Sequence, residues 1–159
     1  MNDRIKIRKL FPTEYSELDF FLYEAIFIPE GVKPPPREIK NQPELQVYVE
    51  DFGSRRGDTA VCAECAGRIV GAAWSRIMDD YGHIDDDTPS LAISLYSDYR
   101  GLGIGTALMN ALLKELKKSG FIQVSLSVQK ANYAVKLYKK TGFEIVNETE
   151  EEYIMIRKL

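Results

Sequence analysis

The chain has 159 residues, of which 45% are hydrophobic and 28% charged, and its formal net charge is −3. This length fits a single domain over residues 1–159 with a full hydrophobic core, and the slightly acidic balance argues against a nucleic-acid-binding surface. The most apolar stretch, Leu18 to Ile28, contains Asp19 and Glu24 and is too short to span a bilayer, and the N-terminus lacks an apolar signal region, so we expect a cytoplasmic protein without a membrane partner.

The first half of the chain combines strand and helix patterns. Ile5 and Ile7 alternate with charged residues, as in a strand. Apolar residues recur at helical spacing from Leu18 to Ile26, and the following prolines end that helix. The elements expected here are a first strand, a helix that begins near Pro12, a second helix from about Pro43 to Phe52, and a hairpin of Thr59–Cys65 and Arg68–Met78.

The second half contains a strongly amphipathic helix after Gly103. Its apolar residues form one stripe, and Gly120 provides the left-handed stop. A polar, acidic connection precedes this half. The expected elements are a strand at Ser90–Tyr96, the helix from Ile104, a strand at Phe121–Val128, a helix at Ala131–Thr141, and a final pair of strands at Phe143–Val146 and Tyr153–Arg157. This order predicts an α/β (α+β) fold in which helices flank a mixed sheet.

The most informative run is Arg100–Thr106, which links an expected strand to the amphipathic helix. Its glycines let a ligand approach the backbone, and a helix N-terminus offers unpaired N–H groups that suit phosphate. The Rossmann pattern fails because Thr106 or Leu108 stands where the third glycine is needed, and no Walker A pattern is present. The pattern that fits is R-x-x-G-x-G, read on Arg100, Gly103 and Gly105.

This run resembles the acetyl-CoA pyrophosphate loop of the GNAT N-acetyltransferase family. A second block, Asn132–Phe143, resembles the later helix of the family, with an Asn near its start, the pair Leu137-Tyr138 and a Gly-Phe ending. The Asn-to-Tyr spacing is one residue shorter than in many members. The resemblance implies the GNAT-like acyl-CoA acyltransferase fold, a mixed and mostly antiparallel sheet of about seven strands flanked by helices.

The resemblance also implies an activity and a set of site residues. The activity is transfer of an acetyl group from acetyl-CoA, the co-substrate, to a primary amine by direct attack in a ternary complex. Tyr138 matches the general acid that protonates the leaving thiolate; its alternative is a core aromatic residue. Asn132 matches a residue that binds the pantetheine amide, and it is equally suited to cap its helix. The expected CoA-binding residues are Ile93, Leu95, Arg100, Gly101, Leu102, Gly103, Gly105, Thr106 and Asn132, with Ile93 and Leu95 acting through their backbone.

Other functions stay open. A non-catalytic acyl-CoA-binding or sensor module could use the same fold, although the presence of Tyr138 argues mildly against it. A dinucleotide-dependent oxidoreductase is disfavoured by the failed Rossmann pattern. The expected partner is a small-molecule or peptide amine, and a homodimer is left open.

The general base is not visible in the sequence. His83, Asp85, Asp86 and Asp87 precede the central strand and are candidates, but a solvated acidic loop is the simpler interpretation. Together with the glutamates near residue 150, these aspartates favour a cationic acceptor.

No metal site is expected. Cys62 and Cys65 form C-x-x-C, but zinc needs two more ligands and His83 is the only histidine. The motif lies in an expected strand, where residues three apart face opposite sides, so we interpret both as ordinary buried or half-buried cysteines.

Overall fold

The computed structural model describes residues 4–159, which form one seven-stranded sheet in the order β1-β2-β3-β4-β5-β7-β6. All neighbouring strands are antiparallel except β4 and β5, which are parallel. The strands are β1 (Ile5–Lys9), β2 (Thr59–Cys65), β3 (Arg68–Arg76), β4 (Ser90–Leu95), β5 (Gln123–Gln129), β6 (Glu144–Glu148) and β7 (Glu152–Lys158). The predicted mixed, mostly antiparallel sheet is therefore confirmed.

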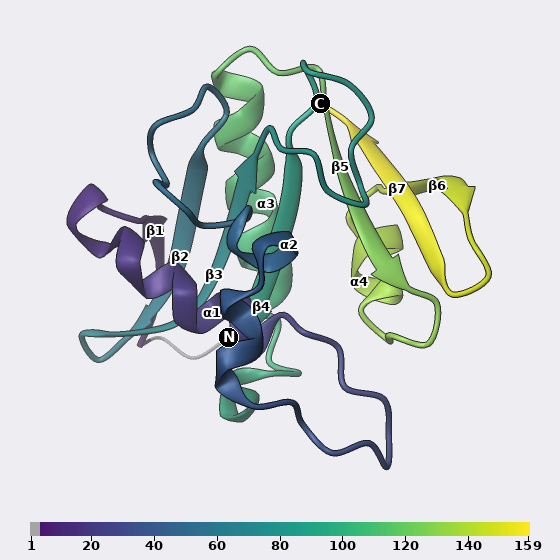
Figure 1. Cartoon of the computed structure of the whole chain (residues 1–159). Helices are drawn as coiled ribbons and strands as arrows, with labels where there is room; N and C mark the ends of the chain where they lie inside the picture. The colour runs from purple at the N-terminus through teal and green to yellow at the C-terminus, as the bar shows by residue number, and fades with distance from the viewer. Residues whose placement is uncertain (1–3) are drawn as a thin grey trace.

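Helices cover both faces of this sheet, α1 and α2 on one side and α3 and α4 on the other (Figure 1). Their bounds are α1 (Leu18–Glu24), α2 (Pro43–Gln46), α3 (Ile104–Lys118) and α4 (Val135–Lys140), with short 3-10 helices at Pro12–Glu17, Arg37–Asn41 and Ser97–Tyr99. The order of strands and helices matches the sequence prediction. None of the helices in the described part of the chain is both long and apolar enough to cross a bilayer.

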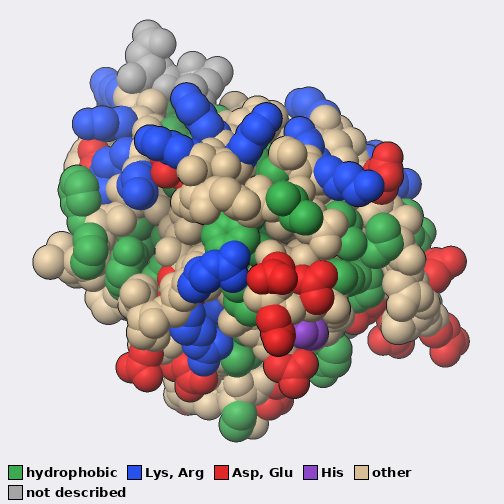
Figure 2. Space-filling view, turned by 90° about the horizontal axis from the view of Figure 1, so that it is seen from above, with side chains coloured by type: hydrophobic (Ala, Val, Ile, Leu, Met, Phe, Trp, Pro, Cys, Tyr) green, Lys and Arg blue, Asp and Glu red, His purple; other side chains and the backbone are tan. Residues whose placement is uncertain are grey.

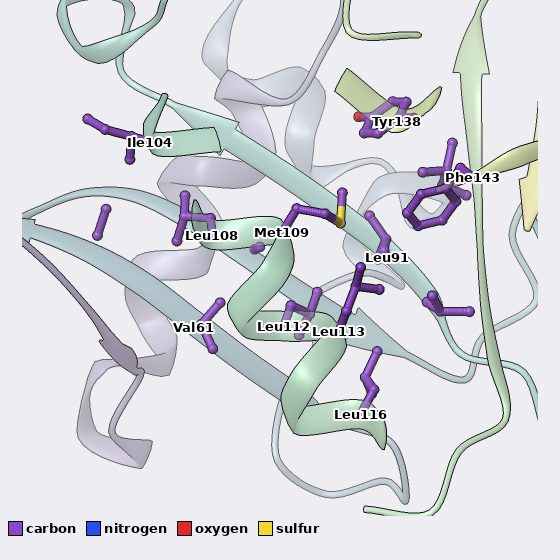
Figure 3. Close-up of a cluster of buried hydrophobic side chains, with 14 of the residues drawn as sticks. Val61, Leu91, Ile104, Leu108, Met109, Leu112, Leu113, Leu116, Tyr138 and Phe143 are labelled. Atoms are coloured by element: carbon purple, nitrogen blue, oxygen red, sulfur yellow. The ribbon is translucent and has the colours of Figure 1, made fainter. Parts of the chain in front are cut away.

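The larger core lies beneath α3. The apolar stripe of this helix turns inward onto the sheet (Figure 3), and six of its residues are buried: Ile104, Leu108, Met109, Leu112, Leu113 and Leu116. Tyr138 and Phe143 close the same core at the other side of the close-up. Burial of whole aliphatic side chains stabilises the fold by roughly 1.5–3 kcal/mol each, so α3 is held firmly and its N-terminus has a fixed position.

The opposite core joins α1 to the middle of the sheet. Phe21 and Leu18 pack with Trp74, which is fully buried and donates its indole N–H to the Tyr48 carbonyl at 3.1 Å. Ser94 Oγ on β4 donates to the Phe21 carbonyl at 2.7 Å. The end of α1 is thereby fixed against the central strand.

We expect Ser94→Ala to lower the free energy of unfolding by about 1 kcal/mol, because it removes one buried hydrogen bond whose acceptor, the Phe21 carbonyl, still receives the Ala25 N–H. Chemical denaturation measures this change. Ser119→Ala, at an exposed position after α3, is the control and should be near neutral. An equal loss in both variants would mean that the Ser94 contact contributes nothing of its own.

The second helix is shorter than predicted, ending at Gln46 rather than near Phe52. Arg76, fully buried on β3, donates through Nη1 to the Val47 and Glu50 carbonyls and forms a bidentate ion pair with Asp58 at 2.9 Å. The carbonyls that a longer helix would use are therefore bound by a side chain from a distant strand. This contact could not be inferred from local periodicity.

β4 and β5 separate after their first residues. Their only paired residues are Ser90 and Ser125, and the two strands then diverge. Tyr96 N donates to Val70 O on β3, and successive residues of a strand direct their backbone groups to opposite sides. The backbone of Leu95 therefore faces the gap between β4 and β5.

Candidate functional site

One large cavity of about 590 Å³ lies at this gap. Four segments line it: the end of α1 with the loop that follows, the last residues of β4, the glycine-rich loop before α3, and the start of α4. The lining residues are Tyr23–Ile28, Pro34, Ile93–Leu95, Arg100, Gly101, Gly103, Gly105, Thr106, Asn132–Ala134 and Lys136–Tyr138. Segments far apart in the sequence thus meet around a single space.

The cavity contains nine of the ten site residues predicted from the sequence. These are Ile93, Leu95, Arg100, Gly101, Gly103, Gly105, Thr106, Asn132 and Tyr138. Leu102 does not line it, and its side chain is half exposed. Its assignment as a CoA-binding residue stays a prediction.

The glycine-rich loop leaves backbone donors facing open space. Gly101 and Gly103 have φ of 74° and 84°, a left-handed conformation that favours glycine. A Cβ added to either would meet no atom within 4 Å. Gly103 is the N-cap of α3 and makes no side-chain cap hydrogen bond, so the first N–H groups of this 15-residue helix, including those of Gly105 and Thr106, have no helical acceptor. This arrangement is suited to an anion.

Arg100 is turned back from the loop toward β4 and α1. Its Nε donates to the Leu95 carbonyl at 3.0 Å, and its Nη2 lies 3.4 Å from Glu24 Oε2. The guanidinium therefore links the free edge of β4 to the end of α1.

Tyr138 lies at the inner wall of the cavity, on α4. Its side chain is buried, and its ring packs edge-on against Phe143 with ring centroids 6.0 Å apart. Figure 3 shows its hydroxyl pointing away from Phe143. Within residues 4–159 this hydroxyl makes no hydrogen bond, and it is not fully enclosed, because no fully buried side-chain oxygen there lacks a partner. Burial raises the pKa of Tyr138 from 10.0 to about 12, because the phenolate would lose its hydration. The group is therefore a protonated phenol in the cavity wall.

Asn132 precedes α4, which begins at Val135 rather than at the predicted Ala131. Its Oδ1 accepts the Ala134 N–H at 2.9 Å, which caps the turn that leads into the helix. The N-cap residue of α4 itself is Ala134, which has no side-chain cap hydrogen bond, so Asn132 caps the preceding turn and is not the predicted N-cap of the helix. Asn132 also lines the cavity, and its amide N–H₂ is not used in that cap, so a second role as a ligand donor stays a prediction.

The candidates for a general base do not reach this cavity. His83 Nδ1 lies 2.9 Å from the Met78 carbonyl, and Asp85 accepts hydrogen bonds from Thr88 Oγ1 and Asp87 N, which hold the pKa of Asp85 below its ordinary value. Neither these residues nor Asp86 line it. Figure 2 shows acidic side chains gathered around the histidine on the upper end of the molecule, whereas the loop before α3 lies at the lower end in Figure 1. The cluster of His83 and the aspartates is therefore best described as part of a solvated acidic loop, which was the simpler of the two interpretations.

A smaller hollow of about 380 Å³ lies beside the β6–β7 turn. Tyr81, from the acidic connection, meets Thr149, Glu150, Glu151 and Glu152 there. The two acidic segments of the sequence are therefore neighbours at this point.

The cysteines behave as expected for residues of a packed strand. Cys62 is buried and Cys65 half-buried, and both are free thiols. Burial raises the pKa of Cys62 to about 11, so its reactive thiolate is suppressed. Among residues 4–159 no group of three or more His, Cys, Asp or Glu side chains is arranged to hold a metal ion.

From the sequence, the Pro29–Pro43 loop was expected to influence the choice of acceptor, but the end of α1 and the residues directly after it were not recognised as part of the site. Tyr23 to Ile28 and Pro34 form one wall of the cavity. Tyr23 donates its hydroxyl to the Pro35 carbonyl, and Arg37 lies over its ring at 4.7 Å, so the proline-rich loop is tied to the helix. No motif marks Tyr23 to Ile28; the only signal was an apolar run followed by prolines.

Comparisons with known proteins agree with this geometry. Residues 22–143 match the model of the acetyltransferase (GNAT) family. The chain is 34% identical over 113 residues to an N-alpha-acetyltransferase of Sulfurisphaera tokodaii, covering 61% of this chain and 67% of that protein. It is 30% identical over 88 residues to a mycothiol acetyltransferase of Propionibacterium freudenreichii, covering 55% of this chain and 28% of the relative. The matched part thus spans between about a quarter and two thirds of these relatives.

Solved structures share the whole fold. The PaiA N-acetyltransferase of Thermoplasma acidophilum, in complex with coenzyme A, superposes with a TM-score of 0.71 at 22% identity and covers 100% of both chains. The ribosomal-protein-S18-alanine N-acetyltransferase of Escherichia coli gives a TM-score of 0.64 at 20% identity, covering 97% of this chain and 93% of that one. With the family model matched across most of the chain, including the glycine-rich loop and the Asn132–Phe143 block, this protein belongs to the GNAT acetyltransferase family.

Proposed function

We propose that the protein is an N-acetyltransferase that moves an acetyl group from acetyl-CoA to a primary amine, by direct attack of the amine within a ternary complex. The observation that carries the proposal is the single cavity at the separation of β4 and β5. It brings together the glycine-rich N-terminus of α3, the free backbone edge of β4 and the buried phenol of Tyr138.

The lining residues fit coenzyme A. The N–H groups at the start of α3 suit its pyrophosphate, and Arg100 and Lys136 add positive charge to the cavity lining. The unpaired edge of β4 can bind an extended chain as an additional strand does. Bound acetyl-CoA supplies an acyl group activated as a thioester; every other part of the site comes from the chain itself.

Tyr138 provides the proton for the departing sulfur. Amine attack on the thioester carbonyl forms the C–N bond and breaks the C–S bond, and the electron pair leaves on sulfur. The proton on Tyr138 Oη passes to that sulfur, which yields a neutral thiol. The attacking nitrogen loses one proton to solvent and the phenolate takes one back, so the products are an amide and a thiol and Tyr138 is again a phenol. A buried phenol whose pKa is about 12 stays protonated at neutral pH and is ready to donate.

The acceptor is a primary amine on a small molecule or a peptide. Relatives whose names state an N-alpha or ribosomal-protein alanine acetyltransferase support an amine of this kind. Release of free thiol from acetyl-CoA tests the proposal directly, across polyamines, amino acids, aminoglycosides and peptide N-termini. If CoA binds and no amine releases thiol, the protein is a sensor module and the proposed activity is wrong.

We expect the acceptor to be cationic, because Glu150 and Glu151 flank the hollow beside Tyr81. Changing both glutamates to Gln should raise KM for a cationic acceptor about 2- to 5-fold at low salt, and the difference should shrink at high salt as the charges are screened. Steady-state kinetics at two ionic strengths measures it. Glu144→Gln, an exposed change at the other end of β6, is the control; a preferred acceptor that is neutral and insensitive to salt would contradict this expectation.

A further inference from the structure

Glu24 occupies a singular position in the cavity. Within the part of the chain that the structure describes, it is the only carboxylate that lines the cavity. Its side chain is 20% exposed, and its partner is the guanidinium of Arg100, whose side chain is 42% exposed. One acid and one base of the lining are thus paired with each other across the space between α1 and the glycine-rich loop.

The same guanidinium also engages the edge of β4. Arg100 Nε donates to the Leu95 carbonyl at 3.0 Å, and the backbone of Leu95 faces the gap between β4 and β5, where β5 provides no partner. A buried or half-buried backbone carbonyl needs a donor, and Arg100 supplies it. The guanidinium therefore contacts the strand edge and the Glu24 carboxylate at the same time.

This contact is weak enough to exchange. The Nη2–Oε2 distance of 3.4 Å is long for a charge-assisted hydrogen bond, and both side chains are partly exposed. A pair of this kind changes an equilibrium by less than about fivefold. Arginine forms shorter, bidentate contacts with phosphate. A phosphate ligand at the start of α3 should therefore bind Arg100 more strongly than Glu24 does.

We propose that Arg100 is a two-position latch on Glu24. In one position it holds the Leu95 carbonyl and the Glu24 carboxylate, as in the structure; in the other it pairs with the phosphates of CoA. The exchange frees the strand edge and Glu24 together, and the released carboxylate binds the acceptor as its ammonium ion, which gives up one proton to solvent before the neutral amine attacks. Glu24 is thus an acceptor-recognition residue that CoA binding makes available. This inference rests on the proposed function, because it takes CoA as the phosphate ligand.

The latch makes an unusual prediction for CoA affinity. Glu24→Gln removes the competitor for Arg100, so titration calorimetry with CoA should show about 2- to 5-fold tighter binding than the wild-type protein. Arg100→Gln should bind CoA more weakly. The decisive comparison is the double variant: adding Glu24→Gln to Arg100→Gln should bring no gain, because no latch is left to release.

Two results would overturn the latch. If Glu24→Gln leaves CoA affinity unchanged, the pair does not compete with CoA. If it tightens binding equally in the Arg100→Gln background, Glu24 acts only through its negative charge on an anionic ligand. Wild-type protein that fails to bind CoA at all would instead remove the proposed function, so the two failures are distinguishable.

The acceptor side has its own readout. With the amine identified by the thiol-release screen, Glu24→Gln should raise the acceptor KM about tenfold while the KM for acetyl-CoA falls. A general structural defect would shift both in the same direction. Glu30→Gln removes a charge from the loop that follows α1, at an exposed position outside the cavity, and should leave both values unchanged. An unaltered acceptor KM in Glu24→Gln would show that Glu24 does not recognise the acceptor.

Discussion

Tyr138→Phe is expected to lower kcat about 100-fold or more while CoA affinity stays close to that of the wild type. The substitution removes only the hydroxyl, whose proton we assign to the leaving sulfur, and general acid catalysis contributes on the order of 10²–10⁴ in rate. The ring and its contact with Phe143 are retained, so the fold should persist. Thiol release at saturating acetyl-CoA and acceptor, together with calorimetry with CoA, separates the catalytic effect from binding.

Tyr153→Phe is the matched control, because Tyr153 is a half-buried phenol on β7 that does not line the cavity. It should turn over like the wild type. If Tyr138→Phe does the same with a good acceptor, Tyr138 is a core aromatic residue and the proton comes from elsewhere.

The raised pKa of Tyr138 has consequences for pH dependence. With a pKa of about 12, the phenol remains protonated up to pH 10, so we expect no loss of kcat from this group between pH 7 and 10. Its folded-state pKa lies above its ordinary value of 10.0, so it contributes stability below pH 10 that is lost as the pH rises toward 12. Alkaline unfolding of Tyr138→Phe should therefore be less steep across that window than that of the wild type.

The predictable parts of the site are those whose geometry is local. Glycines with positive φ, followed by an apolar stripe at helical spacing, require a loop and a helix whatever surrounds them, and the structure contains both. Because α3 packs on the sheet through that stripe, its N-terminus could be located from the sequence. The resemblance to a family then predicted that the Asn132–Phe143 block faces the same cavity, where Asn132 and Tyr138 are found.

Contacts between segments far apart in the chain could not be predicted from the sequence. Nothing near Pro43 indicates that Arg76 binds the Val47 and Glu50 carbonyls and so shortens the helix predicted there. Nor does any local pattern place Glu24 against Arg100. Both contacts join residues from separate elements, and the pairing depends on how those elements pack, which hydrophobic periodicity does not specify.

The acidic residues show a second limit of prediction from sequence. The aspartates before β4 correctly predicted a charged segment, but charge alone does not indicate where that loop lies relative to the cavity. Asp85 uses its carboxylate on Thr88 and Asp87 within its own loop, and His83 contacts the Met78 carbonyl. These side chains therefore order the connection rather than serve the cavity.

Gly103→Val should weaken CoA binding about 10- to 100-fold. The Cβ of a residue at this position would project into open space at the start of α3, where we expect the pyrophosphate to approach the helix N–H groups. Loss of one or two charge-assisted hydrogen bonds accounts for an effect of this size. Calorimetric titration with CoA measures it, and circular dichroism confirms that the helix is retained.

Gly120→Val provides an unusually close control, because Gly120 lies at the other end of the same helix with a φ of 94° and likewise has no atom within 4 Å of an added Cβ. A valine at either site carries a similar cost of left-handed backbone, about 1–2 kcal/mol, so the two variants should lose similar stability. Only Gly103→Val should lose CoA affinity. Equal CoA binding by both variants would place the phosphates away from the N-terminus of α3, and the glycine-rich loop would then serve only to start the helix.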